Sequence, residues 1–185
     1  MKKGNIILVT VVLLIIAGLV TLLLVEGNKP GQYDTLAQCI TDSGAKFYGA
    51  WWCPHCQAQK AMFGKSAHLL PYIECQTPDS KQNSTCNDAQ IEGYPTWQFP
   101  NPIVITSDTD PTVCKPGDSG ADAPAACQQS PMQYRTGWIF AGMPKVISTA
   151  DPVHQGNTWT FPAGSRVTGE TPLDFLSQQT GCPIN

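Results

Sequence analysis

The sequence has few charged side chains, and none of them form a basic run. Its 185 residues include 11 Lys and Arg against 14 Asp and Glu, which gives a net charge of −3. Proteins that bind nucleic acid cluster Lys and Arg against the phosphate backbone. Nucleic acid is therefore not an expected partner.

Histidine is scarce, and a second C-x-x-C motif is absent. Two of the three histidines, His68 and His154, lack ligand spacing to any cysteine pair, whereas structural zinc sites combine four Cys or His ligands at short spacings. We expect both at the surface or at helix ends. Eight cysteines in so short a chain favour disulfides formed in an oxidising compartment. Neither a metal nor another cofactor is expected.

Residues 6–25 contain no charge and are rich in Leu, Ile and Val. As a helix this run would be about 30 Å long, the thickness of a bilayer's hydrocarbon core. Lys2 and Lys3 precede it, which favours a cytoplasmic N-terminus (residues 1–5). We predict a transmembrane anchor, a polar linker at 26–33 and a single-pass protein of the cell membrane whose remaining chain is extracytoplasmic. A cleaved signal peptide is the alternative.

The stretch Phe47–Cys56 reads F-Y-G-A-W-W-C-P-H-C and is followed by a helix-forming segment. It predicts a buried strand that delivers two cysteines to a helix start, where unpaired N–H groups and the helix dipole favour a thiolate. Cys53, exposed at the helix end, should attack, and Cys56 should resolve the mixed disulfide. His55 should stabilise the thiolate further and make the disulfide a better oxidant.

Helical and strand patterns alternate after residue 33, which predicts an α/β domain over residues 34–185. Apolar periodicity, caps and Gly or Pro breaks set the boundaries. The expected helices are 34–43, 57–70 (interrupted at Gly64), 87–92 and 171–180. The expected strands are 46–52, 71–75, one beginning in Gly93–Trp97, and an edge strand at 166–169. Residues 101–157, rich in Pro, Asp, Ser and Gly, are expected to be a mostly irregular insert and not a second domain.

Three runs in this order resemble a known family. They are Y-G-A-x-W-C-P-H-C-x-x-Q-K-x-x-F-G at Tyr48–Gly64, L-P-Y-x-E-C at Leu70–Cys75, and G-Y-P-T-W at Gly93–Trp97. The chain is similar to the thioredoxin-like domain, of the DsbA/thioredoxin type with CPHC, that is fused to bacterial homologues of vitamin K epoxide reductase (VKOR). The resemblance covers about residues 34–99 and resumes near 159–182. It implies a thioredoxin-like fold, with a central mixed sheet flanked by helices. The reductase helix bundle itself is absent from this sequence.

The resemblance also implies roles around the dithiol. Pro95 should lie in cis against the cysteines and present its backbone to a substrate's extended chain. Of the adjacent Trp51 and Trp52, one is expected in the core and the other at the substrate surface. Thioredoxin's buried acid falls here on Phe47, which favours an oxidase or isomerase over a reductase. The residues expected to support the site are Trp52, Pro54, His55, Tyr94 and Pro95.

Six cysteines remain for structural disulfides, and eight cysteines permit 105 connectivities. The resemblance implies the pair Cys75–Cys86, which should stabilise the fold by about 3 kcal/mol through loop closure. An electron-relay role is the alternative for this pair. Cys114–Cys127 lies within the insert, and Cys39–Cys182 is assigned by elimination.

The expected function is the formation or isomerisation of disulfides in exported proteins. Its expected partners are exported protein thiols, the membrane through the chain's own helix, and a membrane quinone reductase of the VKOR/DsbB type that reoxidises the dithiol. One alternative is a tethered reductase of extracytoplasmic thiols. Another is a soft-metal chaperone that binds metal through Cys53, Cys56 and His55.

Overall fold

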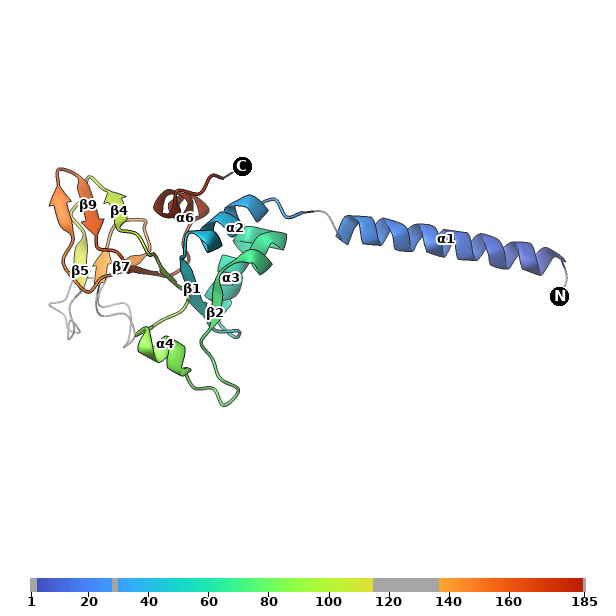
Figure 1. Ribbon diagram of the computed structural model, residues 1–185, viewed down its shortest axis with the longest axis horizontal. Coiled ribbons are helices and arrows are strands. Elements are labelled where there is room, and N and C mark those ends of the chain that lie inside the picture. Colours follow the sequence, from blue (N-terminus) through green and yellow to red (C-terminus); the bar gives the residue numbers. More distant parts are fainter. Residues whose placement is uncertain (1–2, 28–29, 115–136, 185) are drawn as a thin grey trace. The chain divides into compact units, whose positions relative to one another are not determined.

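The computed structural model describes residues 3–27, 30–114 and 137–184. The chain divides into two compact units, Met1–Gly31 and Gln32–Asn185 (Figure 1). The first unit holds a single helix, α1 (Lys3–Gly27). All the elements discussed below belong to the second unit.

The membrane prediction needs correction. A helix that spans a bilayer needs about 20 consecutive apolar residues. In the part of the chain that the structure describes, no helix is long and apolar enough to cross a membrane. This finding overturns the predicted anchor at residues 6–25, together with the single-pass location in the cell membrane.

The second unit is built on a mixed seven-stranded sheet with the order β2-β1-β3-β10-β7-β6-β5. β1 pairs in parallel with β2 and antiparallel with β3, an α/β architecture consistent with a thioredoxin-like domain. The helices are α2 (Asp34–Asp42), α3 (Pro54–Phe63), the 3-10 helix η1 (Gly64–Leu69), α4 (Ser84–Asp88) and α6 (Leu173–Thr180). The strands outside the insert are β1 (Lys46–Gly49), β2 (Tyr72–Glu74), β3 (Thr96–Gln98), β9 (Thr158–Phe161) and β10 (Arg166–Thr168).

The insert differs from the expected irregular loop, because its described part contains strands. They are β4 (Ile103–Thr106), β5 (Thr112–Cys114), β6 (Gly137–Ile139), β7 (Lys145–Ile147) and β8 (Val153–Gln155). β5, β6 and β7 extend the large sheet, and β4 and β8 flank β9 in a second, three-stranded sheet. These strands lie at the end of the unit away from α2 and α3 (Figure 1). Runs of three or four residues are too short for an alternating pattern to be read in the sequence.

β10 is an interior strand and not the expected edge. It pairs antiparallel with β3 on one side and with β7 of the insert on the other. Val167 at its centre is fully buried between Trp97 and Val146 in register. The insert therefore covers what the sequence alone predicts to be the end of the sheet.

The core lies between this sheet and its helices. Phe47 of β1 stacks on Trp97 of β3 with ring centroids 4.6 Å apart. Leu36 and Ile40 of α2 are buried, one helical turn apart, as the sequence periodicity predicts. Burial of these apolar side chains supplies the main drive for folding of this unit.

The helix after the dithiol is interrupted where the sequence predicts. α3 ends at Phe63, and Gly64 has a positive φ of 54°, which favours glycine. The buried face of α3 includes a polar residue, because Gln59 is fully buried, whereas the apolar Ala61 is exposed. The Gln59 amide donates to the Thr171 carbonyl at 3.0 Å and accepts from the Thr171 N–H at 2.6 Å. These two hydrogen bonds offset the cost of burying a polar side chain and join α3 to the segment before α6.

Candidate active site

Two reduced cysteines, Cys53 and Cys56, lie at the start of α3. Cys53 is the N-cap residue, and its sulfur accepts a hydrogen bond from the backbone N–H of Cys56 at 3.3 Å. Pro54 begins the helix, a position that needs no backbone N–H donor. The cap hydrogen bond and the positive end of the helix both favour negative charge on the Cys53 sulfur.

The two cysteines differ in their surroundings. Cys56 is fully buried. Cys53 is only 4% exposed, although the sequence predicts an exposed sulfur at the helix end. Burial raises the pKa of the Cys56 thiol to about 12, the hydrogen bond and charge of Cys53 add to this, and the charge of Lys60 opposes it. Cys56 therefore remains a thiol at neutral pH.

The backbone of β1 closes tightly over Cys56 at Gly49. A Cβ at this glycine would lie 3.0 Å from the Cys56 sulfur and 2.7 Å from Cε2 of Tyr72. The Tyr72 hydroxyl donates to Glu74 at 2.9 Å, and the Lys60 ammonium lies 3.3 Å from the centre of the Tyr72 ring. Burial, followed by the hydrogen bond and charge of Glu74, raises the pKa of Tyr72. Gly49 and Tyr72 were not predicted as site residues, although the Y-G-A and L-P-Y-x-E-C runs contain them.

Pro95 begins the segment that faces the dithiol. The Tyr94–Pro95 peptide bond is cis. The Cys53 thiol donates to the Tyr94 carbonyl at 3.7 Å, and the Pro95 carbonyl accepts from the Gly169 N–H at 2.9 Å. Tyr94 and Pro95 thus link Cys53 to Gly169, which follows β10.

Both tryptophans beside the dithiol are exposed, in contrast to the expectation that one lies in the core. Trp51 is 66% exposed and Trp52 is 53% exposed. The Trp52 indole N–H donates to Gln76 at 2.9 Å, and the ring meets Tyr94 edge to face with centroids 6.3 Å apart. An aromatic surface therefore borders Cys53.

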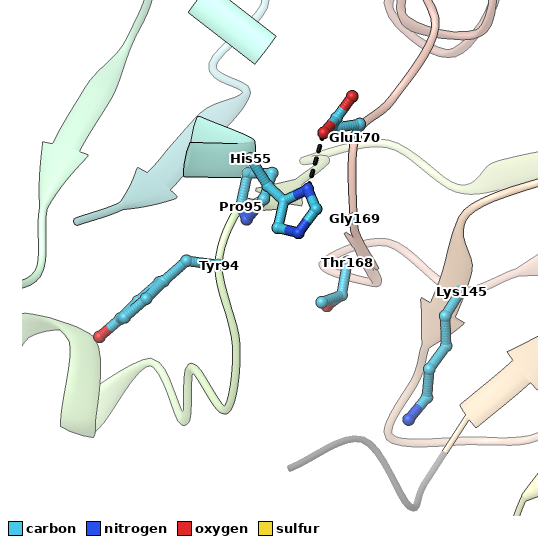
Figure 2. Close-up of a pocket in the computed structure, with 7 residues that line it drawn as sticks. All are labelled: His55, Tyr94, Pro95, Lys145, Thr168, Gly169 and Glu170. Carbon is cyan, nitrogen blue, oxygen red and sulfur yellow. Dashed lines mark hydrogen bonds and ion pairs between the residues drawn. The ribbon is translucent and has the colours of Figure 1, made fainter. Parts of the chain in front are cut away.

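A pocket of about 380 Å³ lies beside Pro95 (Figure 2). His55 extends from α3 toward Glu170, and its Nδ1 lies 2.7 Å from the carboxylate. Lys145 reaches the pocket from β7, and burial lowers its pKa to about 8. The insert therefore contributes to the surroundings of the dithiol. The lining residues are His55, Tyr94, Pro95, Lys145, Thr168, Gly169 and Glu170.

Known proteins resemble part of this chain. No family model matches the chain. Over 68 residues it is 50% identical to "Thiol-disulfide oxidoreductase LTO1" of Arabidopsis thaliana, which covers 34% of this chain and 18% of that protein. Over 74 residues it is 35% identical to "Thioredoxin domain-containing protein 5 homolog" of Drosophila melanogaster, which covers 34% of this chain and 17% of that protein. Part of this chain is thus similar to part of a thiol–disulfide oxidoreductase and to part of a thioredoxin domain-containing protein. The match spans less than a fifth of either curated relative.

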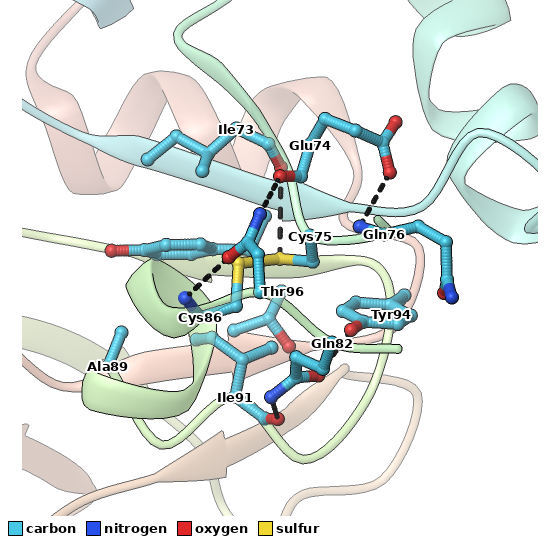
Figure 3. Close-up of a disulfide and its surroundings, with 12 residues drawn as sticks. Ile73, Glu74, Cys75, Gln76, Gln82, Cys86, Ala89, Ile91, Tyr94 and Thr96 are labelled. Carbon is cyan, nitrogen blue, oxygen red and sulfur yellow. Dashed lines mark hydrogen bonds between the residues drawn. A yellow bond between two sulfur atoms is a disulfide. The ribbon is translucent and has the colours of Figure 1, made fainter. Parts of the chain in front are cut away.

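Among the described residues, two disulfides connect different parts of the second unit. Cys39–Cys182 ties α2 to the residues after α6, across a sequence separation of 143. Cys75–Cys86 joins the end of β2 to α4, and both of its cysteines are fully buried (Figure 3). The third expected pair involves Cys127, which lies outside the described residues.

The two remaining histidines of the second unit are surface residues. His68 is exposed, and its Nδ1 lies 2.7 Å from the Lys65 carbonyl oxygen. His154 is exposed and stacks on Trp159 with ring centroids 3.6 Å apart. Within the described ranges, no three His, Cys, Asp or Glu side chains are grouped as metal ligands would be.

Proposed function

We propose that this domain forms or isomerises disulfides in other proteins through Cys53 and Cys56. The observation that carries the proposal is the inequivalence of the pair. Cys53 caps α3 and accepts the Cys56 N–H, whereas Cys56 is fully buried with its pKa raised to about 12. The two sulfurs therefore have different roles: Cys53 is the attacking or leaving sulfur, and Cys56 is the resolving sulfur.

Oxidation of a substrate begins from the Cys53–Cys56 disulfide. A substrate thiolate attacks the Cys53 sulfur, the intramolecular S–S bond breaks, and Cys56 leaves and takes up a proton. A second substrate thiolate then attacks the substrate sulfur of the mixed disulfide and releases Cys53 as a thiolate. Two electrons pass from the substrate to the dithiol. The Cys56 N–H and the start of α3 stabilise the departing Cys53 thiolate.

Isomerisation uses the reduced dithiol. The Cys53 thiolate attacks a substrate disulfide, so that one substrate sulfur becomes bonded to Cys53 and the other leaves as a thiolate. A thiolate from a different substrate cysteine then attacks the substrate sulfur of the mixed disulfide, which forms the new substrate disulfide and releases Cys53 as a thiolate. Cys56 rescues a stalled mixed disulfide by losing its proton and attacking Cys53. The raised pKa of Cys56 includes contributions from the charge and hydrogen bond of Cys53. These contributions end once Cys53 is bonded to substrate, so resolution becomes easier at that stage.

The side chain at position 47 favours the oxidising or isomerising direction. Phe47 is fully buried and stacks on Trp97, so no carboxylate at this position accepts the Cys56 proton. The reduction potential of the dithiol, measured in glutathione buffers, tests the direction. A value near about −120 mV is expected of a strong oxidant. A value near about −270 mV would make the protein a reductase.

We further propose that a membrane quinone reductase of the VKOR/DsbB type reoxidises the dithiol. The support is the resemblance of the Tyr48–Gly64 run to domains fused to such reductases. A Cys56→Ser variant should accumulate a mixed disulfide between Cys53 and a cysteine of the reductase, and a Cys53→Ser variant should not. If such a reductase oxidises the wild-type domain no faster than oxygen does, this partner is wrong.

A further inference from the structure

The residues between Cys75 and Cys86, here called the disulfide loop (residues 76–85), form a hairpin that is closed by this disulfide (Figure 3). Gln76 and Gln82 pair in an antiparallel bridge at its base. Further along, the Thr77 N–H donates to the Lys81 carbonyl at 2.9 Å. The disulfide below the bridge holds the two ends of the loop together. The loop is thus suited to carry side chains at fixed positions.

Each glutamine of the bridge holds one aromatic side chain beside Cys53. Oε1 of Gln76 accepts from the Trp52 indole N–H at 2.9 Å. Oε1 of Gln82 accepts from the Tyr94 hydroxyl. Trp52 immediately precedes Cys53, and the Tyr94 carbonyl accepts from the Cys53 thiol. The loop is therefore connected to both aromatic side chains next to the attacking sulfur.

The amide of Gln82 is fixed in one orientation. Its Nε2 donates to the Ile91 carbonyl at 2.9 Å and to Oδ1 of Asn87 at 3.0 Å. Because both of these neighbours are acceptors, Oε1 must face the Tyr94 hydroxyl. Figure 3 shows Gln82 between Ile91 and Tyr94.

We propose that the disulfide loop is the positioning element of the substrate surface, and that Gln76 and Gln82 act as positioning residues through Trp52 and Tyr94. The inference rests on the proposed function. The surface is an exposed indole set edge to face against a phenol ring. Its ligand is an extended polypeptide that carries an aromatic or aliphatic side chain next to its cysteine. Aromatic side chains that are already fixed lose less rotamer freedom when such a segment binds.

The burial of the disulfide favours this role over an electron relay. Cys75 and Cys86 are each 0% exposed. Thiol–disulfide exchange requires a thiolate to reach one of the sulfurs. The disulfide therefore acts by holding the loop.

The test is a pair of double-mutant cycles in the full chain. Two peptides with a cysteine pair are oxidised by the disulfide form of the protein, one with Trp and one with Ser beside the attacking cysteine. Gln76→Leu should raise KM for the Trp peptide about tenfold, the loss expected for one well-placed hydrogen bond. It should leave kcat, the Ser peptide and the rate with glutathione unchanged. In a Trp52→Phe background, which lacks the indole N–H, Gln76→Leu should have no further effect. Gln82→Leu and Tyr94→Phe form the second cycle.

Several outcomes would overturn the inference. One is an equal loss on both peptides, and another is additive effects of Gln76→Leu and Trp52→Phe. A wild-type protein that exchanges with glutathione but oxidises neither peptide would instead overturn the proposed function. A Cys75→Ser, Cys86→Ser double variant should show the same selective rise in KM, with the reduction potential of Cys53–Cys56 unchanged. Where that variant fails to fold, the glutamine variants decide.

Discussion

The sulfur of Cys53 caps the helix in which Cys56 lies, through a 3.3 Å hydrogen bond from the Cys56 backbone N–H. One cysteine therefore accepts a hydrogen bond from the backbone of the other. The same turn buries the Cys56 side chain completely. A single helix start thus gives the two cysteines different surroundings, and the first prediction depends on the burial of Cys56.

The reduced protein should lose stability at high pH in a way that the oxidised protein does not. Burial raises the pKa of Cys56 from 9.0 to about 12 in the folded state. The contribution of this thiol to stability is fully present below pH 9 and is lost as the pH rises from 9 toward 12, because the unfolded chain releases the proton first. The oxidised protein has no Cys56 proton.

Urea unfolding of the reduced and oxidised forms between pH 8 and 11 measures this difference. Tyr72 also has a raised pKa, but its largest causes, burial and then Glu74, are the same in both forms, so most of the difference between the two profiles reports the dithiol. Parallel pH profiles for the two forms would contradict the prediction.

Gly49→Ala should destabilise the protein by about 1–3 kcal/mol, as overpacking does in a filled core. The added Cβ would lie 2.7 Å from Cε2 of Tyr72 and 3.0 Å from the Cys56 sulfur. Urea unfolding measures the effect. Equal midpoints for this variant and the wild-type protein would show that β1 accommodates the added carbon without cost.

Gln59→Leu should cost about 2–4 kcal/mol of stability. It removes both hydrogen bonds to Thr171 and leaves a buried N–H and a buried carbonyl without their partner. Gln57→Leu, at an exposed position of the same helix, removes one surface hydrogen bond to the Trp51 carbonyl and should cost no more than about 1 kcal/mol. Thermal or urea unfolding compares the two. An equal loss of stability in both variants would mean that leucine destabilises α3 for a reason other than the lost hydrogen bonds to Thr171.

The two structural disulfides should differ in their contributions. Cys39–Cys182 spans 143 residues and Cys75–Cys86 spans 11. Loop-closure entropy assigns about 5 kcal/mol to the first and about 3 kcal/mol to the second. Double Ser variants of each pair, unfolded in urea, give the ranking. A larger loss of stability on removal of Cys75–Cys86 than on removal of Cys39–Cys182 would contradict the prediction.

Much of the second unit could be predicted from short stretches of sequence. The periodicity of Leu36 and Ile40 predicts the buried face of α2, and Gly64 marks the end of α3. The expected membrane anchor at residues 6–25 was wrong. The strands of the insert could not be read, because three-residue strands gain their stability from neighbours in the sheet and not from their own pattern.

The sequence by itself determined the local chemistry of this protein. A C-P-H-C run at a helix start places two sulfurs on one turn wherever that helix is found. Only the tertiary structure decided what surrounds them: Glu170 beside His55, Gln82 beside Tyr94, and Tyr72 packed against Gly49 over Cys56. Two of these contacts join residues far apart in the chain, and all three depend on how strands and loops pack. Hydrogen bonds and burial act between neighbours in space, and a linear pattern does not specify those neighbours.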